Sequence, residues 1–399
     1  MLTEKQLDRY ADVLLWGLST SRKKHFQKND IVVIRYNLQA VRLAEILFEK
    51  LLASGRNPIP RSVQTANMEQ RFFILSNNDQ LIFKAPGEQE LIRHLNGSIA
   101  IIAPESLTHL SGVDPRKIGK AATARKPLRD ILEKRENRGD FSWTLGMFPT
   151  AALAGHAGMS QAEYARQIVR ACFLDKVSPV SHWQEIFKKA QVIKKWLNSM
   201  KMKSIRIESK RMDLLITPGE NRKWVGISGH NIPSFEIFLS PDWRGTSGVY
   251  FADMPSYRDG NLVKNLRIEF KSGKAVTITA EKGEHFARRL LATDPGAGRL
   301  GEFSLTDRRF SKIDRFMANT LFDENFGGSH GNCHVALGSS YADTYTGNPA
   351  ELTSSRKKKL GFNESAIHWD VINTENKCVT ALLDNGRKKI IYENGLFAV

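Results

Sequence analysis

Residues 31–52 read IVVIRYNLQAVRLAEILFEKLL, a stretch in which a strand leads directly into a helix. Residues 31–34 form a short apolar, β-branched run that is typical of a buried strand. Asn37 can cap the helix that follows, in which apolar residues recur at spacings of three and four up to Leu52, and Gly55 ends it. A strand followed by an amphipathic helix is the repeating unit of an α/β fold.

The same alternation continues through the rest of the first half. Thr3 and Gln6 have the spacing of a capping box, which predicts a helix that runs to about Leu18. Further strands are expected at residues 72–75, 81–83 and 99–102, and a long polar helix is expected at residues 117–134. The first half is therefore expected to be an α/β domain with a mainly parallel sheet.

The pattern changes in the second half. A helix is expected after Ser181, because apolar residues from Trp183 to Met200 lie three and four apart. Short strands are expected at residues 205–207, 214–216, 235–239 and 249–251, and a hairpin is expected where the turn KSGK joins residues 266–270 to 276–278. Because 399 residues are too many for one ordinary core, we expect two domains. The first is the α/β domain, over residues 1–185, and the second is an α+β domain over residues 186–399.

The bulk composition is that of an ordinary globular protein, with 41% hydrophobic and 25% charged residues. No apolar run reaches the length of a transmembrane helix, and the first residues lack the apolar segment of a secretory signal. Cys172, Cys333 and Cys378 lie far apart without a CxxC pair. This argues against a disulfide framework and a cysteine-based zinc site. We therefore expect a cytoplasmic protein that has no membrane partner.

The formal net charge of +17 raises a non-enzymatic alternative, a basic protein that binds nucleic acid or another anion. The lysines and arginines are scattered, however, and no basic motif interleaved with aromatic residues is present. The densest runs, residues 22–24 and 356–359, are short enough to be solvated surface. We therefore attribute the positive charge to solubility and to the rate of encounter with charged molecules. Nucleic acid is not the expected partner.

Two sequence motifs match known functional sites, but the secondary structure expected around them differs from that of those sites. Residues 296–301 satisfy G-x-G-x-x-G, but a helical pattern precedes them and a strand-like run follows, the reverse of a dinucleotide site. Their glycines instead indicate a tight turn that presents Glu302. Residues 327–331 satisfy G-x-S-x-G, and Asp343 and His368 follow Ser329 in the chain order of an α/β-hydrolase. A serine hydrolase that uses Ser329 therefore stays open as an alternative, although a strand does not precede this motif.

Several acids and histidines of the second half stand in apolar surroundings. They are Glu236, Glu302, His334, His368 and Asp370. A carboxylate within an apolar run is costly to bury unless it is paired or bound to metal. Positions two apart on a strand share a face, so His368 and Asp370 can point together into a site while Trp369 packs behind them. Imidazoles and carboxylates without thiolates are the ligand types of a hydrolytic site with two metals.

At these residues the sequence resembles the aminopeptidase T and aminopeptidase S family of metallopeptidases. The matching segments are NIPSFE at 231–236, SPDWRG at 240–245, LGE at 300–302, DENFGG at 323–328, HVALG at 334–338 followed by Tyr341, and NESAIHWD at 363–370. They occur in family order, and their combination is more specific than any single segment. The first half resembles the family only in its general α/β character.

The resemblance implies a C-terminal domain that carries a site for two divalent metal ions, zinc or cobalt, with manganese or magnesium as alternatives. The implied metal ligands are Glu236, Glu302, His334, His368 and Asp370. Glu302 takes the position of the glutamate that bridges both metals in the family. His330, four residues before His334, departs from the family pattern, and we favour His334 because the apolar run after it matches.

The implied activity is that of a metallo-aminopeptidase, which hydrolyses the N-terminal peptide bond with a water activated between two metals. Its substrates would be peptides with a free N-terminus, and the enzyme would be a homodimer. Tyr341 matches the family's tyrosine and can donate a hydrogen bond to the oxyanion. Glu302 or an unligated carboxylate can carry the proton to the leaving amine. A metal or a nearby acid such as Glu324 can recognise the free α-amine, and the sequence leaves this choice open.

Overall fold

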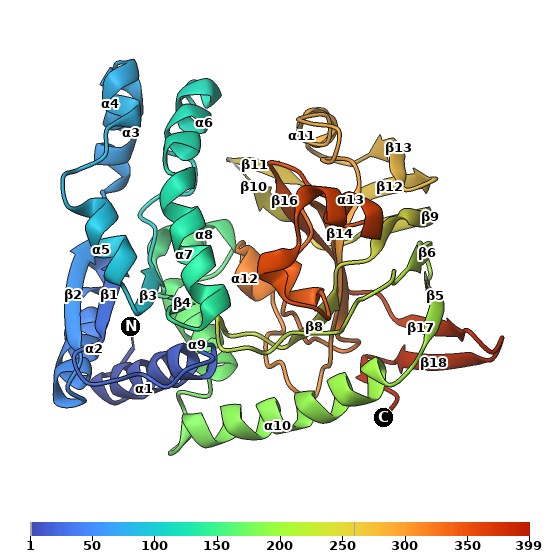
Figure 1. The fold of residues 1–399 in the computed structure, drawn as a ribbon, viewed down its shortest axis with the longest axis horizontal. Coiled ribbons are helices and arrows are strands. Elements are labelled where there is room, and N and C mark those ends of the chain that lie inside the picture. The colour runs from blue at the N-terminus through green and yellow to red at the C-terminus, as the bar shows by residue number, and fades with distance from the viewer. Residues whose placement is uncertain (1, 259) are drawn as a thin grey trace. The chain divides into compact units, whose positions relative to one another are not determined.

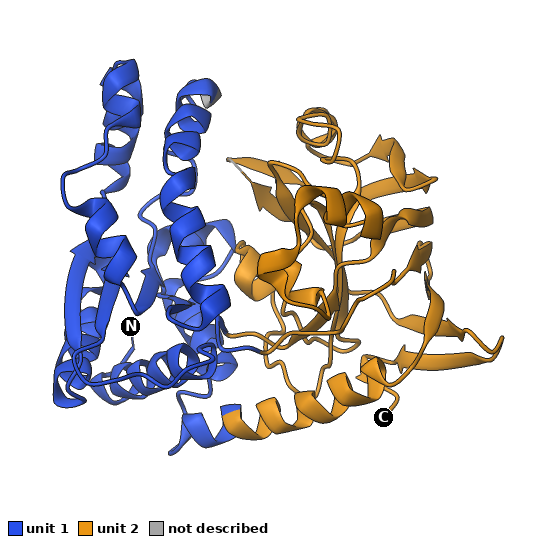
Figure 2. Ribbon diagram, in the orientation of Figure 1, with its two compact units in different colours: residues 1–183, 228–232 blue, residues 184–227, 233–399 orange. Residues whose placement is uncertain are grey.

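The computed structural model describes residues 2–258 and 260–399, which form two compact units (Figure 2). Unit 1 comprises the chain up to Trp183 together with Ser228–Ile232, and unit 2 comprises Gln184–Ile227 and Pro233–Val399. The chain passes from one unit to the other within helix α10 (Pro179–Asn198). No helix within the described ranges is both long and apolar enough to cross a membrane.

Unit 1 contains a parallel sheet of five strands (Figure 1). The strand order is β2 (Asn57–Ser62), β1 (Ile31–Tyr36), β3 (Gly97–Ile102), β4 (Ser142–Met147) and β7 (Asn231–Ile232). Helices α1 (Glu4–Thr20) and α2 (Val41–Ala53) bury their apolar faces, and Tyr10, Leu14 and Leu43 are fully buried. The reciprocal capping box of Thr3 and Gln6 is formed. The parallel sheet with helices that was expected from the alternation in residues 31–52 is therefore present.

The strands expected at residues 72–75 and 81–83 are wrong, because residues 72–75 lie in helix α3 (Ala66–Leu75), and residues 81 and 82 end helix α4 (Asn78–Ile82), which Phe83 follows as the C-cap. Each helix begins at a side-chain cap, Thr65 for α3 and Asn77 for α4. Phe73 and Leu81 are buried against the same apolar cluster, which explains why the runs are apolar. The short runs were ambiguous by periodicity alone, and the two caps favoured helices.

The single helix expected at residues 117–134 is divided into α6 (Pro115–Ala124) and α7 (Lys126–Arg138). Pro127 stands at the start of α7, where its missing N–H is tolerated, and it interrupts a continuous helix. The remaining helices of unit 1 are α5 (Glu88–His94), α8 (Ala151–His156) and α9 (Gln161–Ala171).

Unit 2 contains separate antiparallel sheets. The larger has the order β13 (Lys274–Thr279), β12 (Leu266–Lys271), β9 (Asp242–Ala252), β6 (Asp213–Thr217), β5 (Met202–Ser209), β17 (Lys377–Leu383), β18 (Lys388–Glu393) and β19 (Leu396–Phe397). The smaller has the order β16 (His368–Asn373), β15 (Asn332–Gly338), β14 (Leu300–Thr306) and β8 (Glu236–Leu239). The hairpin expected around KSGK is confirmed as β12 and β13. Tyr250 of β9 donates to the carbonyl of Val371 in β16 at 2.7 Å and so joins the two sheets.

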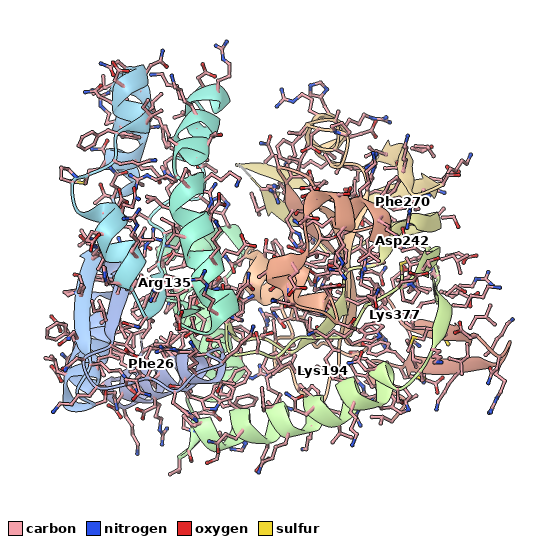
Figure 3. The ribbon with its side chains drawn as sticks, in the orientation of Figure 1. Phe26, Arg135, Lys194, Asp242, Phe270 and Lys377 are labelled. Carbon is pink, nitrogen blue, oxygen red and sulfur yellow. The ribbon has the colours of Figure 1, made fainter. Side chains whose placement is uncertain are left out.

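The other elements of unit 2 are short. Within the described residues they are the hairpin strands β10 (Ser256–Arg258) and β11 (Asn261–Val263), the helices α11 (Glu284–Leu290), α12 (Thr320–Asp323) and α13 (Ser354–Leu360), and the 3-10 helices η2 (Ala342–Thr344) and η3 (Pro349–Glu351). Lys194 of α10, labelled in Figure 3, donates a hydrogen bond to the carbonyl of Gly226 at 2.6 Å. This bond connects α10 to the segment that lies against β8. Gly226 approaches β8 so closely that an added Cβ would lie 2.1 Å from the carbonyl oxygen of Glu236.

A bulge at Gly301 sets the register of β14. Leu300 pairs with Leu337 of β15, but Glu302 pairs with the very next partner, Ala336, so Gly301 is the extra residue. A Cβ at Gly301 would lie 2.4 Å from the carbonyl oxygens of both Gly338 and Ser339. Only glycine fits this approach, which explains the last glycine of the motif at residues 296–301.

Replacing Gly301 by alanine is expected to displace these carbonyls and to lower the free energy of unfolding by about 1–3 kcal/mol, the usual cost of overpacking. Gly298→Ala is the matched control, because the nearest atom to its added Cβ is 3.4 Å away, at ordinary contact distance. Chemical denaturation of both variants measures the difference. Equal stabilities would show that the close approach at Gly301 does not constrain the bulge.

Candidate metal centre

The four-stranded sheet of unit 2 carries the predicted ligands on one face. Glu302 of β14, Ala336 of β15 and Asp370 of β16 lie in one row, and Ser304 and His334 lie in the next. His368 pairs with Gly338 on one side of these rows, and Glu236 of β8 pairs with Thr306 on the other. Since side chains in register on neighbouring strands share a face, all five predicted ligands converge.

Glu302 stands between the two histidines. Its Oε1 atom lies 3.2 Å from Nε2 of His334, and its Oε2 atom lies 3.7 Å from Nε2 of His368. Nε2 of His334 is also 3.2 Å from Oε2 of Glu236, and Nε2 of His368 is 3.3 Å from Oδ1 of Asp370. Each histidine therefore has its own outer carboxylate and shares the inner one.

These groups fit a metal ion. Glu236, Glu302 and His334 offer ligand atoms within 4.8 Å of one another. Glu302 is 3% exposed and His334 is 1% exposed, so both are nearly removed from water. Oε2 of Glu302 is buried and makes no hydrogen bond within the described residues. Because a buried carboxylate oxygen without a donor is costly, this cluster of oxygen and nitrogen atoms is suited to a divalent cation.

The charges of the cluster shift its pKa values strongly. Burial is the main cause that raises the pKa of Glu302 to about 7. Burial alone would lower the pKa of His368, but the charge of Asp370 raises it to about 9. For the acid Asp370 the two effects have the opposite sign. Burial alone would raise the pKa of Asp370, but the charge of His368 lowers it to about 2. Hydrogen bonds to Glu236 and Glu302 similarly outweigh burial and raise the pKa of His334. Without metal, protonated imidazoles therefore offset part of the negative charge of the carboxylates.

Tyr341 lies at the edge of this cluster. Its backbone N–H donates to Oγ of Ser240 at 2.9 Å, and its ring lies 4.6 Å from the ring of His368 between centroids. Tyr341 is 47% exposed overall, but partial burial of its ring, followed by the negative charges of Glu302 and Asp370, raises the pKa of its hydroxyl above the ordinary value. The phenol therefore stays protonated at neutral pH and can act only as a hydrogen-bond donor toward an anion.

Several supporting groups were not singled out by the sequence. The carbonyl of Ser339 lies 2.8 Å from Nδ1 of His368, and Nη1 of Arg258 donates to the carbonyl of His368 at 2.6 Å. Oγ of Ser304 donates to Glu236 at 3.4 Å. The contacts of Ser339 and His368 use backbone carbonyls, which carry no residue-type signal, whereas Ser304 could have been found from its place two residues after Glu302 on one strand face.

Other candidate residues do not join the cluster. His330 is exposed in the turn before β15, whereas His334 is buried on the strand. Ser329 is also exposed, and within residues 2–258 and 260–399 no hydrogen bond joins it to a histidine. The element before this motif is the short helix α12 (Thr320–Asp323), so no strand leads into it as an α/β-hydrolase would require. His368 contacts Asp370 and Glu302 instead of a serine.

One known protein family matches nearly the whole chain. The family model described as thermophilic metalloprotease (M29) matches residues 3–397. The chain belongs to this family. The expected resemblance is thereby confirmed, as is the expected enzyme class of metallopeptidase, a hydrolase that acts on peptide bonds.

The relatives match along most of their length. Aminopeptidase T of Thermus thermophilus is 28% identical over 94% of this chain and 95% of its own, and aminopeptidase T of Thermus aquaticus is 30% identical over 73% and 74%. Aminopeptidase AmpS of Bacillus subtilis is 28% identical over 79% and 80%. The solved structure of wild-type AmpT from Thermus thermophilus covers 100% of both chains with a TM-score of 0.81 and 25% identity. All these relatives are aminopeptidases by name.

Replacing His334 and His330 by alanine, one at a time, tests which of the two histidines binds metal. His334→Ala removes the imidazole that lies between Glu236 and Glu302 and should lower bound metal steeply. His330→Ala is the matched control and should leave bound metal unchanged, because that residue is exposed outside the cluster. Elemental analysis of both purified variants gives the answer. The opposite pattern would move the centre to the 327–331 turn.

Metal binding is expected to release protons. At pH 7 His368, whose pKa is about 9, holds a proton that a metal ion must displace. The apparent affinity for zinc should therefore rise as the pH increases toward 9, by about tenfold per pH unit for each proton displaced. Calorimetry in buffers with different ionisation enthalpies counts the protons. Binding that is independent of both pH and buffer would contradict the protonated state of the cluster.

Proposed function

We propose that this chain is a metal-dependent aminopeptidase that hydrolyses the N-terminal peptide bond of peptides. The observation that carries the proposal is the position of Glu302 between His334 and His368, with Glu236 and Asp370 on the outer sides. The names of the relatives support restriction of the activity to the N-terminal residue.

In this proposal Glu236, Glu302 and His334 would hold one divalent ion, and Glu302, His368 and Asp370 would hold a second. Bound divalent ions supply a Lewis acid that polarises the scissile carbonyl and makes hydroxide available from water near neutral pH. The sheet holds all five side chains on one rigid face, which keeps this arrangement organised before substrate binds.

The chain's own groups handle charge and protons. The hydroxyl of Tyr341, protonated because nearby carboxylates oppose its ionisation, would donate to the substrate carbonyl oxygen as negative charge develops there. A carboxyl group, assigned to Glu302 or to an acid that binds no metal, would carry a proton from the attacking water to the leaving amine nitrogen.

Finer features of the proposal come from the family resemblance. They are zinc or cobalt as the bound metals, with manganese or magnesium as alternatives, a homodimeric assembly and a cytoplasmic location. Metal content of protein purified without added metal, together with light scattering, tests the first two directly.

Dialysis against a strong chelator should abolish hydrolysis of an amino-acid anilide, and zinc, cobalt or manganese should restore it. An N-acetylated peptide should resist cleavage where the free peptide is cleaved, and a serine-directed phosphonate should have no effect. Full activity in metal-free protein, or inactivation by the phosphonate, would contradict the proposal. The second result would favour the serine hydrolase that uses Ser329.

Tyr341→Phe keeps the aromatic ring and removes only the hydroxyl. We expect kcat to fall by about 100- to 1000-fold, as when one oxyanion donor is lost, while bound metal stays unchanged. Tyr345→Phe is the matched control, because Tyr345 packs in a separate apolar cluster with Leu352 and Phe362. Measuring kcat and metal content for both variants decides the role. A normal kcat for Tyr341→Phe would remove the hydroxyl from the mechanism.

A further inference from the structure

Glu324 is a buried acid beside the metal centre. It follows α12 directly and is 8% exposed. Its backbone carbonyl accepts hydrogen bonds from Oγ1 of Thr306 at 3.3 Å and from Nδ2 of Asn332 at 3.1 Å. Thr306 pairs with both Glu236 and Asn332, so these two donors lie in the row of the sheet that holds Glu236. Glu324 is therefore fixed next to one end of the ligand face.

The side chain of the neighbouring Asn325 makes further hydrogen bonds that hold the same segment in place. Its Oδ1 accepts from the backbone N–H of Phe235 at 2.5 Å, directly before Glu236, and its Nδ2 donates to the carbonyl of Leu321 at 2.9 Å. The carbonyl of Asn325 accepts from Oγ of Ser311. These bonds connect the segment to β8 and to the residues before α12, and they leave Glu324 little freedom to move.

The backbone contacts of Glu324 place this residue beside the row of the sheet that holds Glu236. Burial, followed by the charges of Glu236 and Asp370, raises the pKa of its carboxyl group well above the ordinary value. Glu324 is not among the three residues whose ligand atoms lie within 4.8 Å of one another. The hydrogen bond to its side chain, from Nδ2 of Asn325 to Oε1, is long at 3.4 Å and comes from a neutral amide. A buried carboxylate with so weak a donor is matched to a cationic partner.

The N-terminus of a peptide supplies such a cation at the required place. The α-ammonium group has three N–H donors and is separated from the scissile carbonyl carbon by one Cα atom, so the two lie within about 3 Å of each other. A group that recognises it must therefore stand beside the ligands that bind the reacting carbonyl. Glu324 has this position, next to Glu236.

We propose that Glu324 binds the free α-ammonium group of the substrate and so restricts cleavage to the N-terminal residue. This inference rests on the proposed aminopeptidase function. Glu324 would act on substrate binding through a charge-assisted hydrogen bond, and it would be neither a metal ligand nor the carrier of the proton to the leaving group.

Two inhibitors that differ only in the amino group test this role. Leucine hydroxamate and 4-methylpentanoic hydroxamate share the same side chain and the same metal-binding group, and only the first carries an α-amine. On metal-loaded wild-type protein, calorimetry should give the amino compound an affinity about 10- to 100-fold higher, the range of a charge-assisted hydrogen bond. In Glu324→Gln this ratio should fall to near one, while the affinity for the desamino compound and the metal content stay unchanged.

Two further variants support the comparison. Glu393→Gln removes the charge of an exposed glutamate on β18 and should keep the wild-type ratio. Glu324→Asp keeps the charge on a shorter side chain and should give an intermediate ratio, which also provides a result if the glutamine variant folds poorly. For Glu324→Gln, kcat/KM for an amino-acid anilide should fall by the same factor as the affinity ratio.

Other results would overturn the inference. Loss of metal from Glu324→Gln would make Glu324 a ligand. An unchanged affinity ratio with a lower kcat would make it a proton carrier, and an unchanged ratio with unchanged kcat would leave amine recognition to a metal. A wild-type protein that binds both hydroxamates equally would instead contradict the aminopeptidase function itself, so the two failures can be told apart.

Discussion

The one-residue bulge at Gly301 is the constraint on which the candidate site depends. Side chains alternate along a strand, so a shift of one residue moves every following side chain to the opposite face. Because Leu300 pairs with Leu337 while Glu302 pairs with Ala336, the bulge places Glu302 on the face that carries His334 and Asp370. The same glycine allows the backbone to approach Ser339, whose carbonyl contacts Nδ1 of His368.

This register brings the charged side chains of the candidate site together in a place that is nearly inaccessible to water. Carboxylates in such a place are stable only with cations or protons beside them. The two imidazoles supply protonated partners in the absence of metal, and this explains why the pKa of His368 rises to about 9 while the pKa of Asp370 falls to about 2. Keeping these charged groups together in a buried place lowers the stability of the fold, as is common for functional sites.

The sequence predicted the features that depend on local patterns. The strand and helix of residues 31–52 implied the parallel sheet, and the alternation of His368, Trp369 and Asp370 placed two polar groups on one face and a buried indole on the other. The prediction of a strand at residues 72–75 was wrong because a short apolar run fits a helix or a strand equally well. The packing of Phe73 in the tertiary structure favoured the helix. The pairing of Glu302 with Ala336 is a long-range property that no local pattern contains. Residue type and apolar surroundings suggested that these acids and histidines share a site, and the resemblance to the family supplied the role of each.

We propose that Glu302 lies between two metal positions, one served by His334 and the other by His368. Anomalous diffraction at the zinc absorption edge, from crystals grown with zinc, tests it most directly. Two anomalous peaks are expected, one on each side of the Glu302 carboxylate and each within about 2.0–2.2 Å of one of its oxygens. A single peak, or peaks away from Glu302, would contradict it.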